Sequence, residues 1–353
     1  MKTRIRWLTA WIVYYSGFLK LWSLLCARST AVILTYHRIV RENGGELVRS
    51  LSGVEVSLDS FRKQVEYLRE KCSVMPLEEV VERVKRGESL RNVAVITFDD
   101  GWKDNYTNAY PLLLRHGLPA TIFLVTGYVG TTYWFWPERI IHLLSKIEKR
   151  RIPIPEFMRE WVGPRFRYFP MPADAGEMDV FIGRLKYLSG KEQESVIEHL
   201  AALTGVSSAE LEGERIVLGW DEVVEMANNQ ISFGSHTETH PILTEVSLER
   251  VRKEILDSKR EIENRIGRPC LGFAYPNGDW DERVRDLVIE SGYAYACSLG
   301  ETSSLSEVDL YTLKRRVVHE GFAAGVDGKF SKCIFGVEIA GFFSSLKSML
   351  HRR

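Results

Sequence analysis

Short apolar runs alternate with amphipathic helical patterns along most of the 353 residues, and this alternation limits the fold more than any other feature. The candidate strands are the seven apolar runs 31–35, 93–98, 120–125, 231–235, 270–275, 293–298 and 316–319. Helical periodicity separates several of them, as in 248–266, which Gly267 and Pro269 terminate. Strands that alternate with helices favour an α/β fold. Seven of them predict a parallel (β/α) barrel, in which the chemistry collects at the C-terminal strand ends.

The third and fourth candidate strands are separated by a long interval, 131–215. A connection of that length is usually functional or forms an inserted subdomain. We therefore divide the chain into an N-terminal segment, 1–30, a barrel, 31–320, that contains the insertion, and a C-terminal tail, 321–353.

Composition narrows the class of protein. Hydrophobic residues make up 45% and charged residues 27% of the chain, which excludes disordered, collagen-like and polytopic membrane classes. The net charge is zero, but residues 1–41 hold seven basic and no acidic residues, whereas 42–313 hold 32 basic and 44 acidic ones. An acidic body predicts no nucleic-acid partner, and the basic ends leave an anionic membrane surface open as a partner.

The N-terminal segment is basic at 2–6 and then apolar and aromatic from 7 to 27. No convincing cleavage site of a secretion signal follows. A spanning helix needs about 20 apolar residues, and 7–27 has that length but contains Lys20. Helical spacing favours a helix that lies on the membrane surface, with Trp7, Trp11 and Tyr15 on one stripe and Arg6 and Lys20 on the other. Packing on the protein's own core is the alternative, and the tail 334–353 is equally compatible with an interfacial or an ordinary terminal helix.

Polar side chains follow two of the predicted strands. Asp99 and Asp100 come directly after 93–98, and desolvating two adjacent carboxylates is costly unless a positive charge lies beside them. A turn in which one Asp caps a helix is the alternative. His236 and His240 follow 231–235 and can face one ion if the segment is one helical turn. With a carboxylate they form a two-His, one-carboxylate set suited to zinc or another divalent metal that activates water.

Other predicted strand ends carry candidate residues too. His37 and His319 each end a predicted strand, which strengthens the expectation of one shared site. The run 270–275 leads into Pro276-Asn277-Gly278, which is either an ordinary turn or one that fixes backbone N–H groups as an oxyanion hole.

Three runs, 97–101 (TFDDG), 236–240 (HTETH) and 273–278 (FAYPNG), resemble the ordered motifs of the polysaccharide deacetylases, the NodB-homology or carbohydrate esterase family 4 group. The runs 34–38 and 119–123 are also similar to members of this group. The resemblance covers 31–130 and 216–318 and implies a distorted seven-stranded (β/α) barrel, here with a long insertion after the third strand.

The resemblance also implies a division of roles. Asp100, His236 and His240 are expected to hold one divalent metal ion, zinc or else cobalt or manganese. Asp99 is expected to be the general base toward the attacking water, and the backbone N–H of Asn277 to stabilise the oxyanion.

Five further residues complete the predicted site. His319 is the candidate general acid from a late Leu-x-His motif. His37 is expected either to orient other residues of the site or contact the substrate, or to be a core histidine whose hydrogen bonds are satisfied within the protein. Tyr275 and Pro276 are expected to line the substrate pocket. Trp102 is expected either to stack on a sugar or to be buried.

Three features depart from the family pattern. Ala274 stands where the family often has an Arg that orients the base, and Asn277 stands where the most similar subgroup has an aromatic residue. The interval 131–215 has no counterpart in the minimal family domain, and we interpret it as a substrate lid or a membrane-facing cover.

We therefore predict a metal-dependent hydrolase that removes N-acetyl groups from an amino sugar of a bacterial polysaccharide or lipid-linked saccharide. A deformylase or other small-amide hydrolase on the same fold, and a non-catalytic carbohydrate-binding protein, are the alternatives. Five scattered cysteines without a C-x-x-C pair favour buried thiols in a reducing compartment. With the missing cleavage site, they favour the cytoplasmic face of the membrane, through peripheral attachment or a single anchor. The sequence does not indicate an oligomeric state.

Overall fold

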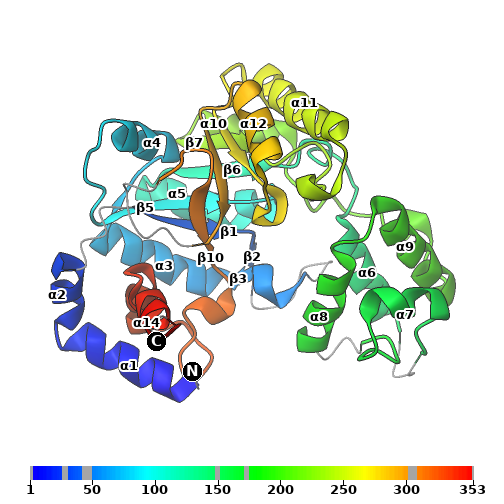
Figure 1. Ribbon diagram of the computed structural model, residues 1–353, viewed down its shortest axis with the longest axis horizontal. Coiled ribbons are helices and arrows are strands. Elements are labelled where there is room, and N and C mark those ends of the chain that lie inside the picture. Colours follow the sequence, from blue (N-terminus) through cyan, green and yellow to red (C-terminus); the bar gives the residue numbers. More distant parts are fainter. Residues whose placement is uncertain are drawn as a thin grey trace.

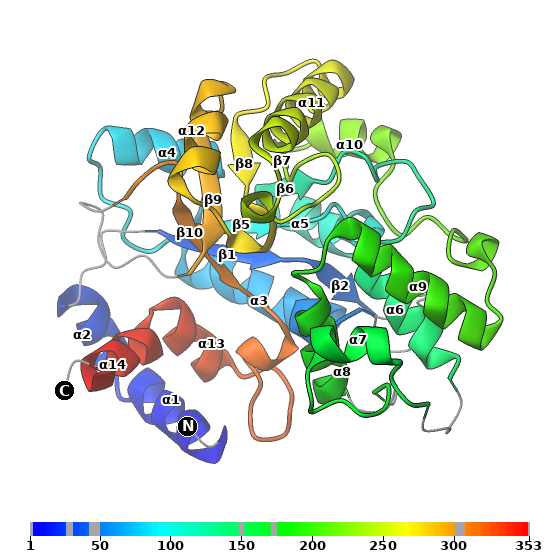
Figure 2. The same ribbon diagram turned by 45° about the vertical axis from the view of Figure 1, so that its right-hand side comes forward.

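Seven parallel strands form a closed barrel in the computed structural model, which describes residues 3–25, 31–41, 50–147, 152–170, 175–300 and 308–351 (Figures 1 and 2). In chain order the strands are β1 (Val32–Tyr36), β5 (Val93–Phe98), β6 (Ala120–Leu124), β7 (Ile231–Ser235), β8 (Gly272–Ala274), β9 (Tyr295–Leu299) and β10 (Leu313–Val317). The ring closes because β1 pairs with β10 on one side and with β5 on the other. The predicted seven-stranded barrel is confirmed, with the long insertion after β6, its third strand.

The seventh strand is the one whose predicted bounds are least accurate. β10 begins three residues before the expected 316–319 and reads Leu-Lys-Arg-Arg-Val. Three consecutive cations interrupt the apolar pattern by which a strand is found in a sequence. The strand nevertheless alternates as a barrel strand does, because Arg315 is buried while Lys314 and Arg316 are partly exposed.

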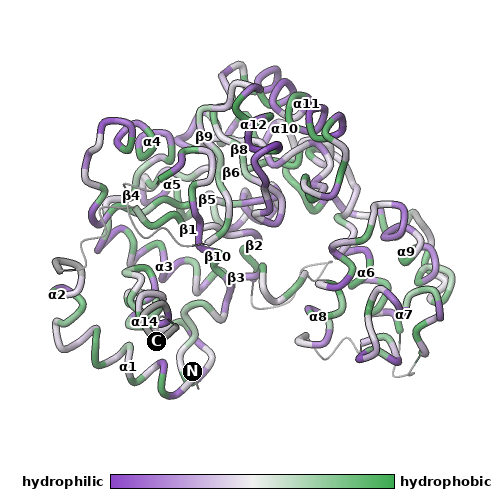
Figure 3. The backbone as a smooth tube through the Cα atoms, in the orientation of Figure 1, coloured by the Kyte–Doolittle hydropathy of each residue, from purple (hydrophilic) through white to green (hydrophobic). Residues whose placement is uncertain are grey.

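Amphipathic helices cover the outside of the barrel. They are α3 (Leu58–Lys71), α4 (Leu77–Lys85), α5 (Tyr110–His116), α10 (Trp220–Ala227), α11 (Leu248–Ile266) and α12 (Glu282–Glu290). In α11, Ser247 caps the first turn, Val251, Ile255 and Ile262 are buried, and Gly267 ends the helix at φ 70°. Figure 3 shows the resulting alternation of hydrophobic and hydrophilic residues along α4 and α11. Three short strands complete this frame: β4 (Ser73–Val74) beside β5, and the pair β2 (Arg38–Val40) and β3 (Glu55–Ser57).

The insertion folds into helices with a hydrophobic core of their own. These helices are α6 (Trp136–Ser145), α7 (Glu156–Val162), α8 (Ala175–Leu185) and α9 (Gly190–Thr204). Ile140, Met158, Phe181 and Leu200 are fully buried in a cluster distinct from that of the barrel. Figures 1 and 2 show these helices at the right of the view, whereas the two chain ends lie at the lower left.

The two chain ends pack against each other. The N-terminal segment forms α1 (Thr3–Tyr15) and α2 (Phe18–Leu25), which break at Gly17, where φ is 79°. The tail forms α13 (Lys332–Ile339) and α14 (Phe342–His351). Ala10 and Val13 of α1 are buried against Ile334 and Val337 of α13.

This packing corrects the predicted stripes of the N-terminal segment. The segment is two helices, not one, and Arg6 does not face outward. Its guanidinium lies 2.8 Å from the Glu338 carboxylate and donates to the Phe322 carbonyl oxygen at 2.5 Å. Trp7, predicted to share the outward apolar stripe, packs against the terminal core instead. No described helix combines the length and the apolar character that crossing a bilayer requires.

Candidate active site

The carboxylates Asp99 and Asp100 lie at the C-terminal end of β5, inside the opening of the barrel. All six residues of β5 are buried, and the Asp99 N–H donates to the Tyr36 carbonyl oxygen of the neighbouring β1 at 2.9 Å. Asp99 is only 3% exposed. Asp100 has a left-handed backbone, φ 70°, so the chain turns sharply between the two carboxylates.

Arg315 of β10 holds Asp99 from across the barrel. Two of its guanidinium nitrogens donate to the two Asp99 carboxylate oxygens, at 2.6 and 2.8 Å. Burial alone would raise the pKa of Asp99, but the charge of Arg315 outweighs it and keeps that pKa below its usual range. Asp99 is therefore ionised at neutral pH. An arginine that orients this carboxylate is thus present, although Ala274 leaves the position predicted from the family motif without one.

Asp100, His236 and His240 come together as a possible metal site. One ligand atom from each lies within 4.8 Å of the other two, and no other such group of three is found among the described residues. The His240 and His236 Nε2 atoms are 3.5 and 3.7 Å from the Asp100 Oδ1 atom. The two histidines face Asp100 without the helical turn that was stated as the condition: the segment is a loop in which Thr237 and His240 have positive φ.

Further contacts orient His236 and Asp100. The His236 Nδ1 atom lies 2.7 Å from the Ala274 carbonyl oxygen, which leaves Nε2 to face Asp100. The Trp102 indole N–H donates to the Asp100 Oδ2 atom at 3.0 Å. The Asp100 Oδ1 atom is buried and has no hydrogen-bond partner among the described residues. An orphaned carboxylate oxygen between two imidazole nitrogens fits a divalent cation, which would satisfy all three.

Burial keeps the two histidines neutral. It lowers the pKa of both His236 and His240 to about 4, against the opposing effect of the Asp99 charge. Neutral imidazoles carry the lone pairs that a metal ion needs.

The loop that carries these histidines is fastened from two sides. Glu254 of α11, which is 3% exposed, accepts hydrogen bonds from the backbone N–H groups of Glu238 and Thr239 at 3.0 and 2.8 Å. On the other side the Gly127 N–H donates to the Glu238 carbonyl oxygen at 2.8 Å. A Cβ at position 127 would lie 2.6 Å from that oxygen, so only glycine permits this approach.

His37 and His319, the two other histidines predicted at strand ends, have different surroundings. The His37 Nε2 atom lies 4.0 Å from the Asp99 Oδ2 atom, so His37 adjoins the site. His319 is partly buried, and the charged groups that act on it are Arg6, Glu320 and Asp179. None of these belongs to the predicted catalytic set.

Three residues that were predicted to contact the substrate are buried in the structure. Tyr275 is fully buried and donates its hydroxyl to the Tyr311 carbonyl oxygen, so it packs in the core instead of lining the opening. Pro276 is also buried, at the start of the turn. Trp102 is 2% exposed and is committed to Asp100, which agrees with the alternative of burial and not with sugar stacking. Asn277, in the same turn as Pro276, has a left-handed backbone with φ 58°.

The insertion supplies side chains that the motifs did not reveal. Lys186, just after α8, donates to the Asn277 Oδ1 atom at 3.3 Å. The Phe135 ring lies 6.1 Å from the His240 ring, centroid to centroid. Glu138 of α6 is 4% exposed, and burial, with a smaller contribution from Asp100, raises its pKa to about 7. No local sequence pattern connects these residues with the barrel, because their approach depends on the fold of the whole insertion.

The barrel, the carboxylate pair and the histidine loop all correspond to one family. A family model described as polysaccharide deacetylase matches residues 86–163 and 189–296, just over half of the chain. The chain belongs to the polysaccharide deacetylase family. The resemblance stated from the three motifs is thereby confirmed.

The chain is also similar to individual proteins, in sequence or in fold. It is 29% identical over 132 residues to the poly-beta-1,6-N-acetyl-D-glucosamine N-deacetylase of Staphylococcus aureus, a match that spans 35% of this chain and 43% of the relative. The match therefore spans less than half of the curated relative. The deacetylase PplD of Streptococcus pyogenes, solved in complex with acetate, has a TM-score of 0.54 at 19% identity and matches 84% of this chain and 95% of its own. IcaB of Ammonifex degensii has a TM-score of 0.53 at 15% identity, over 83% and 93% of the two chains. Both solved structures share the fold.

Proposed function

We propose that the protein is a metal-dependent hydrolase that removes N-acetyl groups from an amino sugar of a polysaccharide. One observation carries this proposal: a buried carboxylate, Asp99, is fixed by Arg315 beside a set of metal-ligating side chains. Family membership supports the same reaction class.

Asp100, His236 and His240 would hold the metal ion, and their donor set suits zinc, with cobalt or manganese as alternatives. When bound, a divalent ion would lower the pKa of a water molecule at this position and polarise the amide carbonyl.

Asp99 is the proposed general base. Arg315 uses one lone pair of each carboxylate oxygen, and the remaining lone pairs can accept the proton of an attacking water. The low pKa of Asp99 makes it a weak base that is always ionised, so it accepts this proton only from an acidified water. The rigid bidentate contact with Arg315 fixes the orientation of the Asp99 carboxylate, and therefore the direction of proton transfer. The carboxylate needs little reorganisation during the reaction step.

His37 is better placed than His319 to return a proton to the leaving amine. Its Nε2 atom is 4.0 Å from the Asp99 carboxylate, whereas the groups that act on His319 lie outside the catalytic set. The backbone N–H of Asn277 is proposed to stabilise the oxyanion, since its turn follows β8 at the same end of the barrel.

The named activity of the staphylococcal relative suggests β-1,6-linked N-acetylglucosamine as the first polymer to test. We expect the protein to release acetate and free amines from an oligomer of this sugar after loading with zinc, and from the β-1,4-linked oligomer more slowly. Asp99→Asn is expected to abolish release while zinc binding persists, and His236→Ala is expected to lose both. An N-formyl oligomer in the same assay tests the deformylase alternative.

Two results would contradict the proposal. Equal activity of wild type and Asp99→Asn would exclude Asp99 as the base. Oligosaccharide binding without release from any acylated sugar, in a zinc-loaded protein, would favour the non-catalytic carbohydrate-binding alternative.

A further inference from the structure

A cavity lies between the terminal helices and the barrel, and none of the candidate active-site residues lines it. It has a volume of about 500 Å³ and opens between the terminal helices and the outer side of β1, β5 and β10. Val32 and Val93, which line it, are the first residues of β1 and β5, whereas Asp99 follows the last residue of β5. Along β5, six residues of strand separate the two sites by about 20 Å. On β10 the lining residues Lys314 and Arg316 flank Arg315 in the chain but alternate with it across the strand, because Arg315 is buried and its two neighbours are partly exposed.

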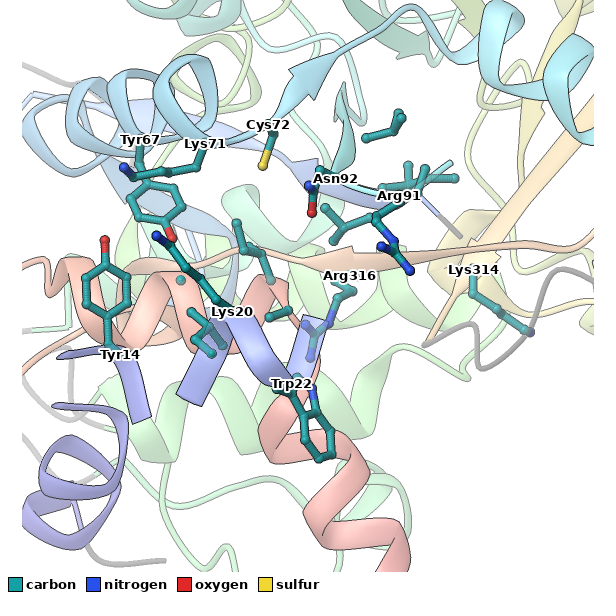
Figure 4. A pocket seen from close by; sticks show the side chains of 18 of the residues that line it. Tyr14, Lys20, Trp22, Tyr67, Lys71, Cys72, Arg91, Asn92, Lys314 and Arg316 are labelled. Carbon is teal, nitrogen blue, oxygen red and sulfur yellow. The ribbon is translucent and has the colours of Figure 1, made fainter. Parts of the chain in front are cut away.

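Basic side chains surround this cavity. They come from α2, α3, the start of β5 and β10, and are Lys20, Lys71, Arg91, Lys314 and Arg316. None of the described lining residues is acidic. Figure 4 shows Lys20 and Lys71 with Tyr14 and Tyr67 at one end, and Arg91, Arg316 and Trp22 around the middle of the view.

Within the described part of the chain, two of these cations have no carboxylate partner. Lys71 pairs with Glu70 at 2.7 Å and Arg316 with Glu338 at 3.4 Å. Arg91 and Lys314 have no carboxylate within 4.0 Å among the described residues. Lys314 instead donates to the Ser298 hydroxyl at 2.8 Å, and burial lowers its pKa. A partly desolvated cation without a counter-ion favours an anionic ligand.

The rest of the lining is apolar. Leu19 and Trp22 of α2, Ile33 of β1, Val93 of β5 and Ile339 of α13 contribute to it. Cations beside apolar walls match a ligand that joins an anionic group to a hydrocarbon part.

The helices that wall the cavity also carry an apolar outer face. Its exposed residues are Ile5, Leu8, Trp11, Ile12, Tyr15, Phe18 and Leu21. Ile5, Leu8, Ile12 and Tyr15 follow the helical period along one side of α1. No acidic residue occurs in residues 1–41, so nothing in this segment repels an anionic surface. Exposed aliphatic and aromatic side chains with flanking cations are the features of a helix that lies in a bilayer interface.

We propose that α1 and α2 lie in the surface of an anionic bilayer and that the cavity behind them binds the phosphate head group of a lipid. A lipid is favoured over a soluble phosphate because the same two helices wall the cavity and carry the exposed apolar face. The proposal does not depend on the deacetylase activity, since no residue that lines the cavity belongs to the proposed catalytic or metal-binding set.

The test uses the full chain and two kinds of vesicle, one of phosphatidylcholine alone and one with about a third of phosphatidylglycerol. Cosedimentation is measured for the wild type and two double variants. Arg91→Gln with Lys314→Gln removes cavity charge, and Leu8→Gln with Ile12→Gln removes part of the apolar face. Arg83→Gln with Lys85→Gln on the exposed face of α4 is the control for net charge, and Leu114→Gln with Leu203→Gln is the control for exposed apolar residues.

We expect the wild type to bind the anionic vesicles more tightly than the neutral ones. The cavity variant is expected to bind about 30-fold more weakly, since each cation near such a surface contributes about fivefold. The apolar variant is expected to lose most binding to both kinds of vesicle, and both control variants to bind as the wild type does. Circular dichroism melting of every variant shows that it is folded.

Three outcomes would overturn the proposal. Equal binding of wild type and cavity variant excludes a head-group role for the cavity. An equal loss in the α4 control shows that net charge alone governs attachment. If inorganic phosphate raises the melting temperature of the wild type but not of the cavity variant, and vesicles do not bind, the cavity is a site for a soluble anion.

Discussion

At the scale of single residues, the contact between Asp99 and Arg315 dominates the site. Both side chains are almost fully buried, and they face each other with two hydrogen bonds. Such a pair contributes little net stability over an apolar pair, but each member alone is a buried, uncompensated charge. The contact is therefore better understood as positioning the carboxylate than as stabilising the barrel.

Removing Arg315 alone should consequently be more damaging than removing the pair. We expect Arg315→Met to lower the free energy of unfolding of the metal-free protein by about 3–5 kcal/mol. The double variant with Asp99→Asn is expected to recover part of that loss, because no buried charge is left unpaired. Urea unfolding of the wild type, both single variants and the double variant measures the coupling, and strictly additive losses would contradict this account.

Glu138 gives the site a pH-dependent stability. Its pKa rises from 4.5 to about 7 on folding, mainly through burial. Between these values the folded chain keeps a proton that the unfolded chain has lost, so stability falls as the pH rises through this window.

Glu138→Gln is expected to remove this dependence. From pH 5 to pH 8 the metal-free wild type should lose about 2 kcal/mol of stability that the variant keeps. Denaturant unfolding at the two pH values measures this difference, and Glu198→Gln, on an exposed carboxylate of the same insertion, is the control. If the free energy of unfolding changes equally with pH in the wild type and in Glu138→Gln, Glu138 is ionised in the folded protein and the prediction is wrong.

At the scale of elements, the sequence predicts the strands that are apolar and misplaces the one that is charged. β5 and β7 begin and end where expected. For β5 the reason is burial along the whole strand, which leaves a nearly continuous apolar run. β10 holds Arg315 inside the barrel, and a single buried arginine cannot be told from its neighbours Lys314 and Arg316 by local pattern. The position of the arginine that contacts Asp99 was missed for this reason, although Asp99 itself and the Asp100, His236 and His240 cluster were named.

The histidine loop depends on an element that no motif includes. Glu254 of α11 accepts the N–H groups of Glu238 and Thr239, between the two histidines. Its replacement by alanine leaves both groups unsatisfied and lets the loop move.

We expect Glu254→Ala to weaken zinc binding by about 10–100-fold, as measured by competition with a chelator of known affinity. Glu261→Ala lies on the same helix, where Glu261 pairs with Arg265 at 2.8 Å on the surface, and is expected to bind zinc as the wild type does. Equal affinities for Glu254→Ala and the control would show that the loop keeps its shape without this contact.

At the scale of the whole molecule, the barrel lies between two helical units that differ in their relation to the site. The terminal helices pack on each other and on α3, whereas the insertion reaches the strand ends through Phe135, Glu138 and Lys186. The length of the insertion was visible in the sequence, but its contacts were not, since they arise from tertiary packing. Its predicted role as a substrate cover stays a prediction.

A cavity in the core of the insertion tests that role without touching the barrel. Phe181 is fully buried there, and Phe181→Ala is expected to destabilise the insertion by about 3–5 kcal/mol. Zinc content should stay at the wild-type level, because all three ligands belong to the barrel loops. If the insertion covers the substrate, KM for an acetylated pentasaccharide should rise severalfold, with a smaller effect on an acetylated monosaccharide that makes fewer contacts beyond the reacting sugar. Unchanged KM values for both, in a variant whose melting curve shows the insertion loosened, would mean that the insertion takes no part in binding the substrate.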